Sequence, residues 1–371
     1  GVFLIVRCSP IFEYSQTALN FVAIIGMLTA FFAATVALVQ NDIKKIIAYS
    51  TCSQLGYMFF AVGIGAYHVA VFHLFTHAFF KALLFLGSGC VIHSFNNEQD
   101  IRLMGGVWKK IPYTYVLMII GTLALTGFPF LSGYYSKDAI LEFAYFKGST
   151  IGYYATCIGI ITAFLTSIYS WRLIFKTFHG KYKNKKIKVK NIYESSQTML
   201  LTAGLLGIGS VLAGILFKNL FIGQNSSNFW GNSILILNNI LHDHPPVWLP
   251  ITTTLLITLA IPISYYFFIN NVKFLNNIII KNKKFYNFFL NKWYFDEVYS
   301  LIFVKPLKKI GMFFWQRGDI KTIDRFGPDG FSRIIKIISD NSVNFQSGYL
   351  YHYAFVMLLG LTILLTYLII F

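Results

Sequence analysis

The sequence is poor in charged residues, which make up 12% of its 371 positions, whereas an ordinary soluble domain carries about 25%. Apolar residues account for 56% of the chain and aromatic residues for 18%. This shortage of charge excludes a disordered chain and an ordinary soluble domain. Several uninterrupted apolar runs instead reach the roughly 20 residues that a helix needs to cross a bilayer. The sequence therefore predicts an all-α, polytopic transmembrane helix bundle.

Acidic residues are especially few, since 14 Asp and Glu accompany 31 Lys and Arg for a formal net charge of +17. Such a surplus can indicate nucleic-acid binding. Here, however, the basic residues lie in short segments between apolar runs, at 44–45, 109–110, 181–190 and 281–292. Lipid headgroups and the positive-inside rule explain that placement. We expect the lipid bilayer, and no nucleic acid, as a partner.

Cysteine is also scarce, and its four residues form no CxxC pair, which excludes the ligand sets of zinc knuckles and iron–sulfur clusters. We expect no metal site in this chain and interpret the cysteines as small apolar side chains. The loop pattern His242-Asp243-His244 resembles a metal site only superficially. Residue 1 is Gly and residues 1–6 have the composition of the end of an apolar segment, so we expect a fragment with no visible signal peptide.

Eight apolar stretches are candidates to cross the membrane, and the fourth of them is interrupted. If each crosses once, the loops at 40–45, 93–110, 175–195 and 271–348 share one face. These loops hold most of the basic residues, which places them on the cytoplasmic side or its organellar equivalent. The stretches are 18–39, 46–65, 68–92, 111–146, 150–174, 196–221, 247–270 and 349–371.

The segment 293–340 differs from the spans, because it mixes apolar with charged residues and contains no 20-residue window dry enough to cross. Its apolar positions recur at helical spacing. That pattern predicts an amphipathic helix lying along a membrane or along other subunits; a plain surface helix between spans is the alternative. The sequence Gly-Pro-Asp-Gly at 327–330 interrupts it, and 331–338 resumes the pattern.

His73, His77 and Lys81 are spaced four residues apart, so one helix carries them on a single stripe. Imidazole titrates near neutral pH, and a lysine held away from water can lose its proton there too. The stripe could therefore relay protons. For either histidine alone, an interhelical hydrogen bond without transport is the more common role, and a haem or metal site lacks a third ligand on the stripe.

Gly127, Pro129 and Gly133 lie in the middle of the span 111–146, where they predict an unwound segment between two half-helices. We expect Lys137 in the first turn of the second half-helix, where the helix dipole disfavours its charge. The adjacent Asp138 has the opposite effect, so the pair could act as a proton valve. A loop with a surface Lys–Asp pair is the alternative, and Glu142 is either a second acid on that face or a loop residue.

Polar residues elsewhere in the spans extend the candidate route. They could hold water chains, although each is individually more often a helix-to-helix hydrogen bond. They are Thr51, Ser53, Gln54, Thr162, Thr166, Ser167, Tyr169 and Ser170.

Two long motifs give the chain a specific resemblance: LVQNDIKKIIAYSTCSQLGYM at 38–58 and FHLFTHAFFKALLF at 72–85. With these motifs the chain resembles the antiporter-like membrane subunits of respiratory complex I. Ser136-Lys137-Asp138, the basic stretch around 293–296 and the final span make it most similar to the distal type, chain 5 of mitochondria or subunit L of bacteria. The match covers essentially the whole chain.

The resemblance implies a proton-translocating subunit of NADH:ubiquinone (quinone) oxidoreductase in a bacterial inner or mitochondrial inner membrane. His73, His77 and Lys81 would belong to a central polar axis, with Lys137 and Asp138 on the broken helix near the exit. The implied cofactors, NADH, FMN, iron–sulfur clusters and quinone, would belong to partner subunits, with none in this chain. The helix at 293–340 would lie as a strap along adjacent antiporter-like subunits.

In one respect the sequence departs from the family: the first of its two inverted repeats is nearly all missing, so we expect that an isolated product of this length does not pump. The alternative functions are a subunit of a multi-chain Na⁺/H⁺ antiporter or membrane-bound hydrogenase, or a non-conducting scaffold. The expected organisation is a truncated span and loop at 1–17, the second antiporter-like repeat at 18–180, additional spans at 181–270, the basic lateral helix region at 271–348 and a terminal anchor at 349–371.

Overall fold

The computed structural model describes residues 1–184, 192–237 and 246–371, and within these ranges the chain forms helices and no strand. The predicted pattern His242-Asp243-His244 lies outside the described residues.

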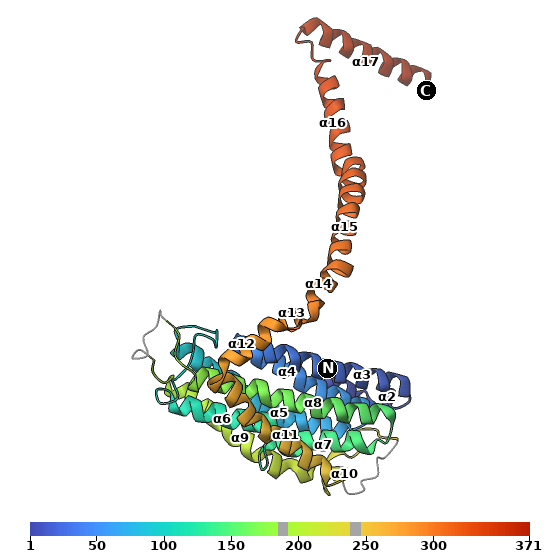
Figure 1. The fold of residues 1–371 in the computed structure, drawn as a ribbon. Coiled ribbons are helices and arrows are strands. Elements are labelled where there is room, and N and C mark those ends of the chain that lie inside the picture. The colour runs from blue at the N-terminus through green and yellow to red at the C-terminus, as the bar shows by residue number, and fades with distance from the viewer. Residues whose placement is uncertain (185–191, 238–245) are drawn as a thin grey trace. The chain divides into compact units, whose positions relative to one another are not determined.

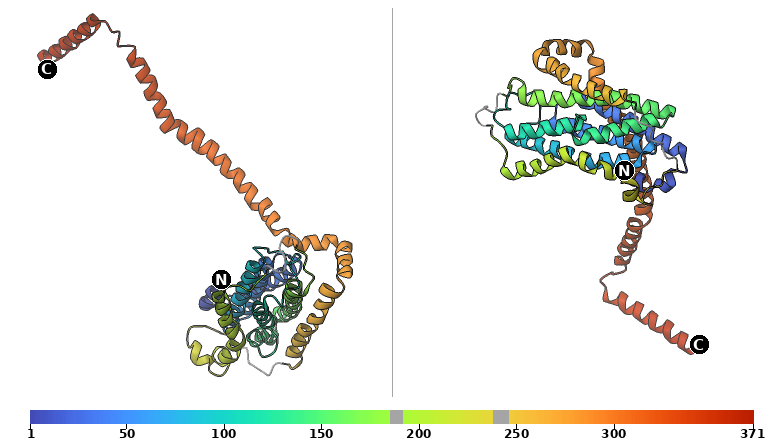
Figure 2. Two further views of the ribbon diagram at one scale, coloured as in Figure 1. Left: turned by 90° about the vertical axis from the view of Figure 1, so that its left-hand side faces the viewer. Right: turned by 90° about the horizontal axis from the view of Figure 1, so that it is seen from below.

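Contacts divide the chain into two units, Gly1–Trp293 and Tyr294–Phe371. The first unit is a bundle whose long helices run side by side (Figures 1 and 2). Its helices are α1 (Val2–Arg7), α2 (Ser9–Phe12), α3 (Gln16–Val39), α4 (Ile43–Gly63), α5 (Tyr67–Ser94), α6 (Pro112–Thr126), α7 (Ser132–Phe146), α8 (Thr150–Ile174), α9 (Gln197–Phe221), α10 (Ser226–Trp230), α11 (Trp248–Tyr265), α12 (Val272–Lys281) and α13 (Lys283–Leu290).

The prediction of an all-helical bundle with membrane-spanning helices is confirmed. In the described part of the chain six helices are long and apolar enough to cross a membrane: α3, α5, α8 with its π-helical extension to His179, α9, α11 with its extension to Asn270, and α17 (Leu350–Ile370). The other two predicted stretches are α4, which carries more polar residues, and the α6–α7 pair, whose helices have 15 residues each.

Helices α3 and α4 approach each other backbone to backbone, because small residues face the contact. A Cβ atom added to Gly26 would lie 2.4 Å from the backbone nitrogen of Phe60. A Cβ added to Gly56 would lie 2.5 Å from the backbone nitrogen of Ala30. A Cβ added to Gly63 would lie 2.3 Å from the backbone nitrogen of Ala23. Small residues spaced along facing helices allow this close packing in membranes, where the hydrophobic effect does not drive helices together.

The buried apolar residues of the bundle fall into two clusters separated along the helices. In α4 one cluster holds Ile43, Ile46 and Ile47, and the other begins at Tyr57. In α5 one cluster ends at Ala70 and the other begins at Phe80. Between the clusters, the buried residues of α4, α5, α7 and α8 are largely polar: Ser50, Ser53, Gln54, His73, Thr76, His77, Ser136, Lys137, Thr162, Thr166 and Ser167. We call this set the polar layer.

The loops that were predicted to share one face come together at one end of the bundle. The loop after α3 pairs with the loop after α5: the Ile43 N–H donates to Gln99 O at 3.0 Å, and the Ile101 N–H donates to Asn41 O at 2.9 Å. The segment after α8 joins them through the Trp108 N–H, which donates to the carbonyl of Phe178. The prediction is therefore confirmed for these three loops.

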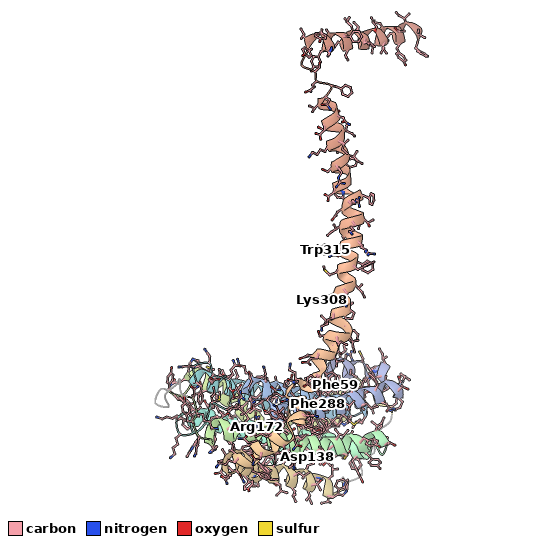
Figure 3. The ribbon with its side chains drawn as sticks, turned by 45° about the horizontal axis from the view of Figure 1, so that its top comes forward. Phe59, Asp138, Arg172, Phe288, Lys308 and Trp315 are labelled. Atoms are coloured by element: carbon pink, nitrogen blue, oxygen red, sulfur yellow. The ribbon has the colours of Figure 1, made fainter. Side chains whose placement is uncertain are left out.

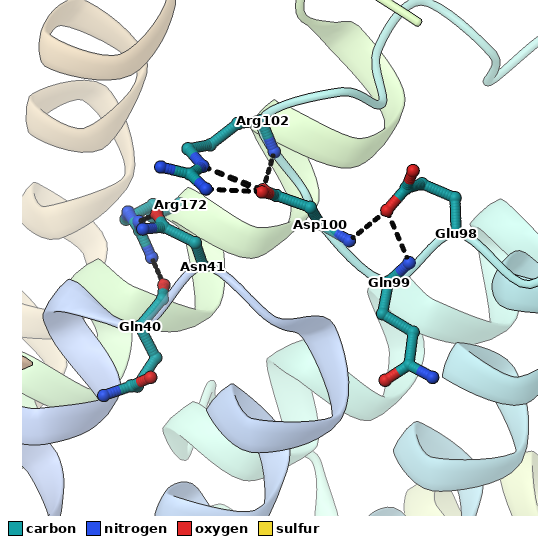
Figure 4. A network of polar contacts seen from close by, with 7 residues as sticks. All are labelled: Gln40, Asn41, Glu98, Gln99, Asp100, Arg102 and Arg172. Atoms are coloured by element: carbon teal, nitrogen blue, oxygen red, sulfur yellow. Dashed lines mark hydrogen bonds and ion pairs between the residues drawn. The ribbon is translucent and has the colours of Figure 1, made fainter. Parts of the chain in front are cut away.

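Arg172, near the end of α8, holds this end of the bundle together. Its guanidinium is buried and donates to Gln40 O at 2.5 Å and to Asn41 Oδ1 at 2.8 Å (Figure 4). Nearby, Arg102 donates to both carboxylate oxygens of Asp100. Burial by itself raises the pKa of Asp100, but the hydrogen bonds from Arg102 outweigh it and lower that pKa below its ordinary value.

The predicted interruption of the fourth span is confirmed: α6 ends at Thr126 and α7 begins at Ser132. Gly127 caps α6 in the left-handed region at φ 86°, which glycine adopts without steric cost. The chain then returns so closely that a Cβ on Gly133 would lie 1.8 Å from the carbonyl oxygen of Ala124. The break is therefore held by contact between the two half-helices.

The second unit is a run of helical segments followed by a terminal helix: α14 (Phe295–Tyr299), α15 (Lys305–Phe313), a π-helical stretch Phe314–Asp324, α16 (Pro328–Val343) and α17. The amphipathic character predicted for 293–340 is confirmed, and Lys308 and Trp315 extend outward from the run (Figure 3). The break at 327–330 was predicted to end at Phe331, but α16 already begins at Pro328. Proline is favoured at the first position of a helix because its missing N–H needs no partner there.

The cysteines follow the prediction only in part. Cys90 is buried and fills space inside the bundle, whereas Cys52 and Cys157 are exposed on the surface of this chain. Cys52 and Cys157 therefore do not fill space inside the bundle, because each lies on the outward face of its helix.

Gly133→Ala tests the contact that holds the broken helix. The added methyl group must displace the Ala124 carbonyl, so we expect a loss of about 1–3 kcal/mol in stability, typical of overpacking. The measurement is the thermal unfolding midpoint in detergent. Gly204→Ala in α9, where no atom lies within 4 Å of the new methyl, is the matched control. Equal midpoints for the two variants would contradict the packing argument.

Candidate functional site

The stripe predicted from the spacing of His73, His77 and Lys81 lies on α5 and faces the interior of the bundle. Only 1% of His73, 6% of His77 and 4% of Lys81 is exposed. The imidazole centroids of the two histidines are 6.0 Å apart. The His73 nitrogens bond to other side chains and not to His77.

His73 links three helices. Its Nδ1 lies 2.9 Å from Ser136 Oγ of α7, and its Nε2 lies 3.1 Å from Gln54 Oε1 of α4. Ser136 Oγ also lies 2.8 Å from Oγ1 of Thr76, which follows His73 by one turn of α5. The imidazole therefore has a hydrogen-bond partner on each nitrogen. By contrast, His77 Nε2 has no hydrogen-bond partner among the described residues.

Lys81 is bound at the opposite end of the stripe. Its Nζ donates to Ser50 Oγ at 2.6 Å, and the Tyr169 hydroxyl donates to the same oxygen at 2.7 Å. A cavity of about 10 Å³ adjoins this group and is also lined by Ser170, whose Oγ has no partner among the described residues. The cavity is close to the minimum size for one water molecule, and five of its ten lining residues are polar.

Lys137 lies on α7, but not where the sequence predicted. It is the sixth residue of α7, so the expectation that it lies in the first turn is wrong. Helical geometry resumes at Ser132, directly after the break, which moves Lys137 into the second turn. The helix dipole acts mainly within the first turn, so burial is the main influence on this amine.

The Lys137 amine is buried without a hydrogen bond to any described residue. Lys137 is 1% exposed, and in the described part of the chain its Nζ has no hydrogen-bond partner. The ring of Tyr57 can stabilise its charge, since the ring centroid lies 5.1 Å from Nζ. The alternative of a surface Lys–Asp pair is therefore excluded, and the amine occupies a place where its charge is costly.

Asp138 is buried in the bundle (Figure 3), with 6% of the residue exposed. Thr253 Oγ1 of α11 lies 3.5 Å from its Oδ1, and its Oδ2 has no partner among the described residues. A cavity of about 250 Å³ reaches this carboxylate and is also lined by Glu142 and Lys218. Glu142 thus lies one turn beyond Asp138 on the same helix face, as a second acid at the cavity.

Five of the predicted polar residues use their hydroxyl groups as donors to helix carbonyls, the role expected of each such residue individually. Thr51 donates to Ile47 O within its own helix, and Ser53 donates to Ala30 O of the neighbouring helix. Thr162 and Thr166 likewise bond within α8, and Ser167 donates to α11. Of the remaining three, Gln54 and Tyr169 bond to groups of the site, and Ser170 lines the cavity beside Lys81.

The sequence argument missed two partners, Ser50 and Ser136. Ser136 could have been predicted, because it lies four residues after Ser132 and that spacing places both hydroxyls on one face of a helix. Ser50 carried no such signal, since its role depends on α5 and α8 meeting α4. In the described ranges, His, Cys, Asp and Glu form no group of three or more placed to hold a metal ion.

Two family models match the chain. The model described as NADH:quinone oxidoreductase/Mrp antiporter, TM, matches residues 1–170, and the model described as NADH dehydrogenase subunit 5 C-terminus matches residues 232–369. The first includes α5 and α7, which carry the candidate site. The second includes the amphipathic run and α17.

Curated relatives align with nearly the whole chain. NADH-ubiquinone oxidoreductase chain 5 of Phytophthora infestans is 45% identical over 367 residues, which are 97% of this chain and 55% of the relative. NADH-quinone oxidoreductase subunit L of Rhodobacter capsulatus is 39% identical over 435 residues, covering 98% and 61%. The chain thus spans little more than half the length of these relatives.

A solved structure shares the fold. A chain of the Mrp complex from Dietzia sp. superposes with a TM-score of 0.58 at 18% identity, covering 100% of this chain and 36% of the other. At this identity the likeness concerns the fold alone.

Ser50→Ala tests the shared hydrogen-bond acceptor. The change leaves Lys81 Nζ and the Tyr169 hydroxyl without their partner, and an unsatisfied buried group costs about 1–3 kcal/mol. We expect a lower thermal unfolding midpoint in detergent. Ser88→Ala is the control, because that hydroxyl bonds only to the Phe85 carbonyl of its own helix. If the two variants melt together, Ser50 does not hold Lys81 and Tyr169.

Proposed function

We propose that this chain, which belongs to the chain 5 (subunit L) family of antiporter-like NADH:quinone oxidoreductase subunits, carries protons through the polar layer of its helix bundle. Because it spans little more than half the length of its curated relatives, the activity is proposed for the chain within a complete complex. The electron-transfer reaction would take place elsewhere and drive proton movement here through charge changes at buried groups.

The observation that supports this role is an unpaired lysine inside a membrane-spanning bundle. An insertion cost of about 2.5–3.5 kcal/mol for a central lysine is not offset by any hydrogen bond to Lys137 Nζ within the described residues. A group with that cost alternates easily between charged and neutral forms. A lysine with a purely structural role would instead be expected to have a hydrogen-bond partner for its amine.

A route can be traced from these contacts. Lys81, bonded to Ser50, lies one turn of α5 from His77, which lies one turn from His73. His73 contacts Ser136, the residue before Lys137, and Asp138 follows on the same helix. Single waters would bridge the gaps, including the 6.0 Å between the imidazole centroids.

The exit of this route is the cavity beside Asp138. It is lined by Glu142 and Lys218, and α7 and α9 both end shortly beyond it, away from the basic loops. A carboxylate at such a cavity can pass a proton to water. The apolar clusters on both sides of the polar layer would prevent protons from passing without these groups.

The remaining expectations concern partners. We infer that NADH, FMN, the iron–sulfur clusters and the quinone are held by other subunits, and that the run 293–340 fastens this chain to adjacent antiporter-like subunits. The membrane would be a bacterial or mitochondrial inner membrane. The likeness to the Mrp complex concerns the fold and does not favour Na⁺/H⁺ antiport.

Lys137→Gln in the assembled complex separates a proton carrier from a scaffold. Raising the transfer barrier by ~1.4 kcal/mol already slows a step about tenfold, so we expect a loss of proton translocation of at least that size. The measurement is the number of protons translocated per electron in sealed vesicles. Lys110→Gln, an exposed lysine at the basic end, is the control.

Lys137→Arg strengthens the test, because arginine keeps the positive charge and does not release its proton. A proton carrier fails with arginine as it does with glutamine. Full translocation by both variants would show that the chain serves only as a scaffold.

A further inference from the structure

A large basic cavity lies at the loop end of the first unit, apart from the polar layer. Its volume is about 720 Å³. Three segments far apart in the sequence form it: residues 101–104 after α5, residues 176–183 at the end of α8, and residues 268–276 at the corner between α11 and α12. None of its lining residues belongs to the proposed proton route.

The charge of the cavity has one sign. Arg102, Lys176, Lys181, Lys183 and Lys273 line it, and among the described residues no Asp or Glu does. Arg102 is already engaged by Asp100 at 2.6 Å, which leaves four lysines facing the cavity. Like charges held this close repel one another, so an anionic occupant would relieve the repulsion.

Part of the cavity lining is apolar and belongs to a membrane-spanning helix. Phe268 and Ile269 come from the extension of α11, which is part of the candidate span Trp248–Asn270. Lys176 lies over the Phe268 ring, with Nζ 5.7 Å from its centroid. Asn271 then caps α12, whose first N–H groups begin at the cavity. The cavity thus joins the hydrocarbon region to a cluster of cations.

We propose that this cavity binds the headgroup of an anionic glycerophospholipid, with the phosphate among the lysines and an acyl chain along Phe268 and Ile269. A free phosphate ion would use the cations and leave the apolar wall uncovered. A phospholipid would contact both the cations and the apolar residues. Basic pockets between membrane helices on the cytoplasmic or matrix side are suited to anionic headgroups. The proposal does not depend on proton transfer.

Lys181→Gln combined with Lys273→Gln tests the site in the purified complex. The probe is dioleoyl phosphatidylglycerol, titrated into delipidated complex, with bound lipid measured by mass spectrometry. Each lysine near an anionic headgroup contributes about 1 kcal/mol, which is about fivefold in affinity. We therefore expect the double variant to bind roughly 30-fold more weakly. Lys109→Gln with Lys110→Gln removes two exposed lysines from the same end outside the cavity and should bind as the unchanged complex does.

Three comparisons decide the result. Dioleoyl phosphatidylcholine should not compete, and inorganic phosphate should compete far more weakly than the lipid. The proposal is overturned if both double variants bind phosphatidylglycerol equally well, or if inorganic phosphate displaces it at equal concentration. It is also overturned if the cavity variant loses neighbouring subunits while its lipid binding is unchanged, because the cations would then serve a protein contact.

Discussion

The structure depends on one constraint: a layer of buried polar groups must be satisfied inside a bundle that is apolar above and below it. The two apolar clusters leave the polar layer between them on α4, α5, α7 and α8. Most of its hydroxyl groups are satisfied by helix carbonyls, and His73 and Lys81 are satisfied by hydroxyl and amide side chains. The ionisable groups left without hydrogen-bond partners among the described residues, Lys137 above all, are therefore the positions where we propose that the layer changes its charge.

The broken helix brings the lysine and the aspartate of α7 into that layer. In a continuous helix across 112–146, the positions of the α6 residues would fix the directions of the α7 side chains. The break at 127–131 instead allows the half-helix α7 to begin within the polar layer. Ser136 then meets His73, Lys137 lies near Tyr57, and Asp138 reaches the outer cavity. The close contact of Gly133 with the end of α6 fixes this geometry. Three consecutive residues thus reach three different neighbours.

Much of this arrangement was predictable from the sequence, because the spacing of apolar residues and the local composition determine where helices form and break. The spans, the stripe on α5 and the interruption around Pro129 follow from local patterns. The turn occupied by Lys137 was not predictable, since it depends on where helical geometry resumes. The shared acceptor Ser50, the anchor Arg172 and the basic cavity come from segments far apart in the chain. Among the polar residues of α8, Thr162 and Thr166 donate to carbonyls of their own helix.

The central claim is that Lys81 and Lys137, on different helices, belong to one serial proton route. The most direct test is a double-variant cycle of Lys81→Gln and Lys137→Gln in the assembled complex, with proton translocation per electron as the readout. Groups that act as a unit are strongly non-additive. The account predicts that the double variant translocates at least as many protons per electron as the more damaged of the two single variants. Losses that multiply in the double variant would show two independent routes and contradict it.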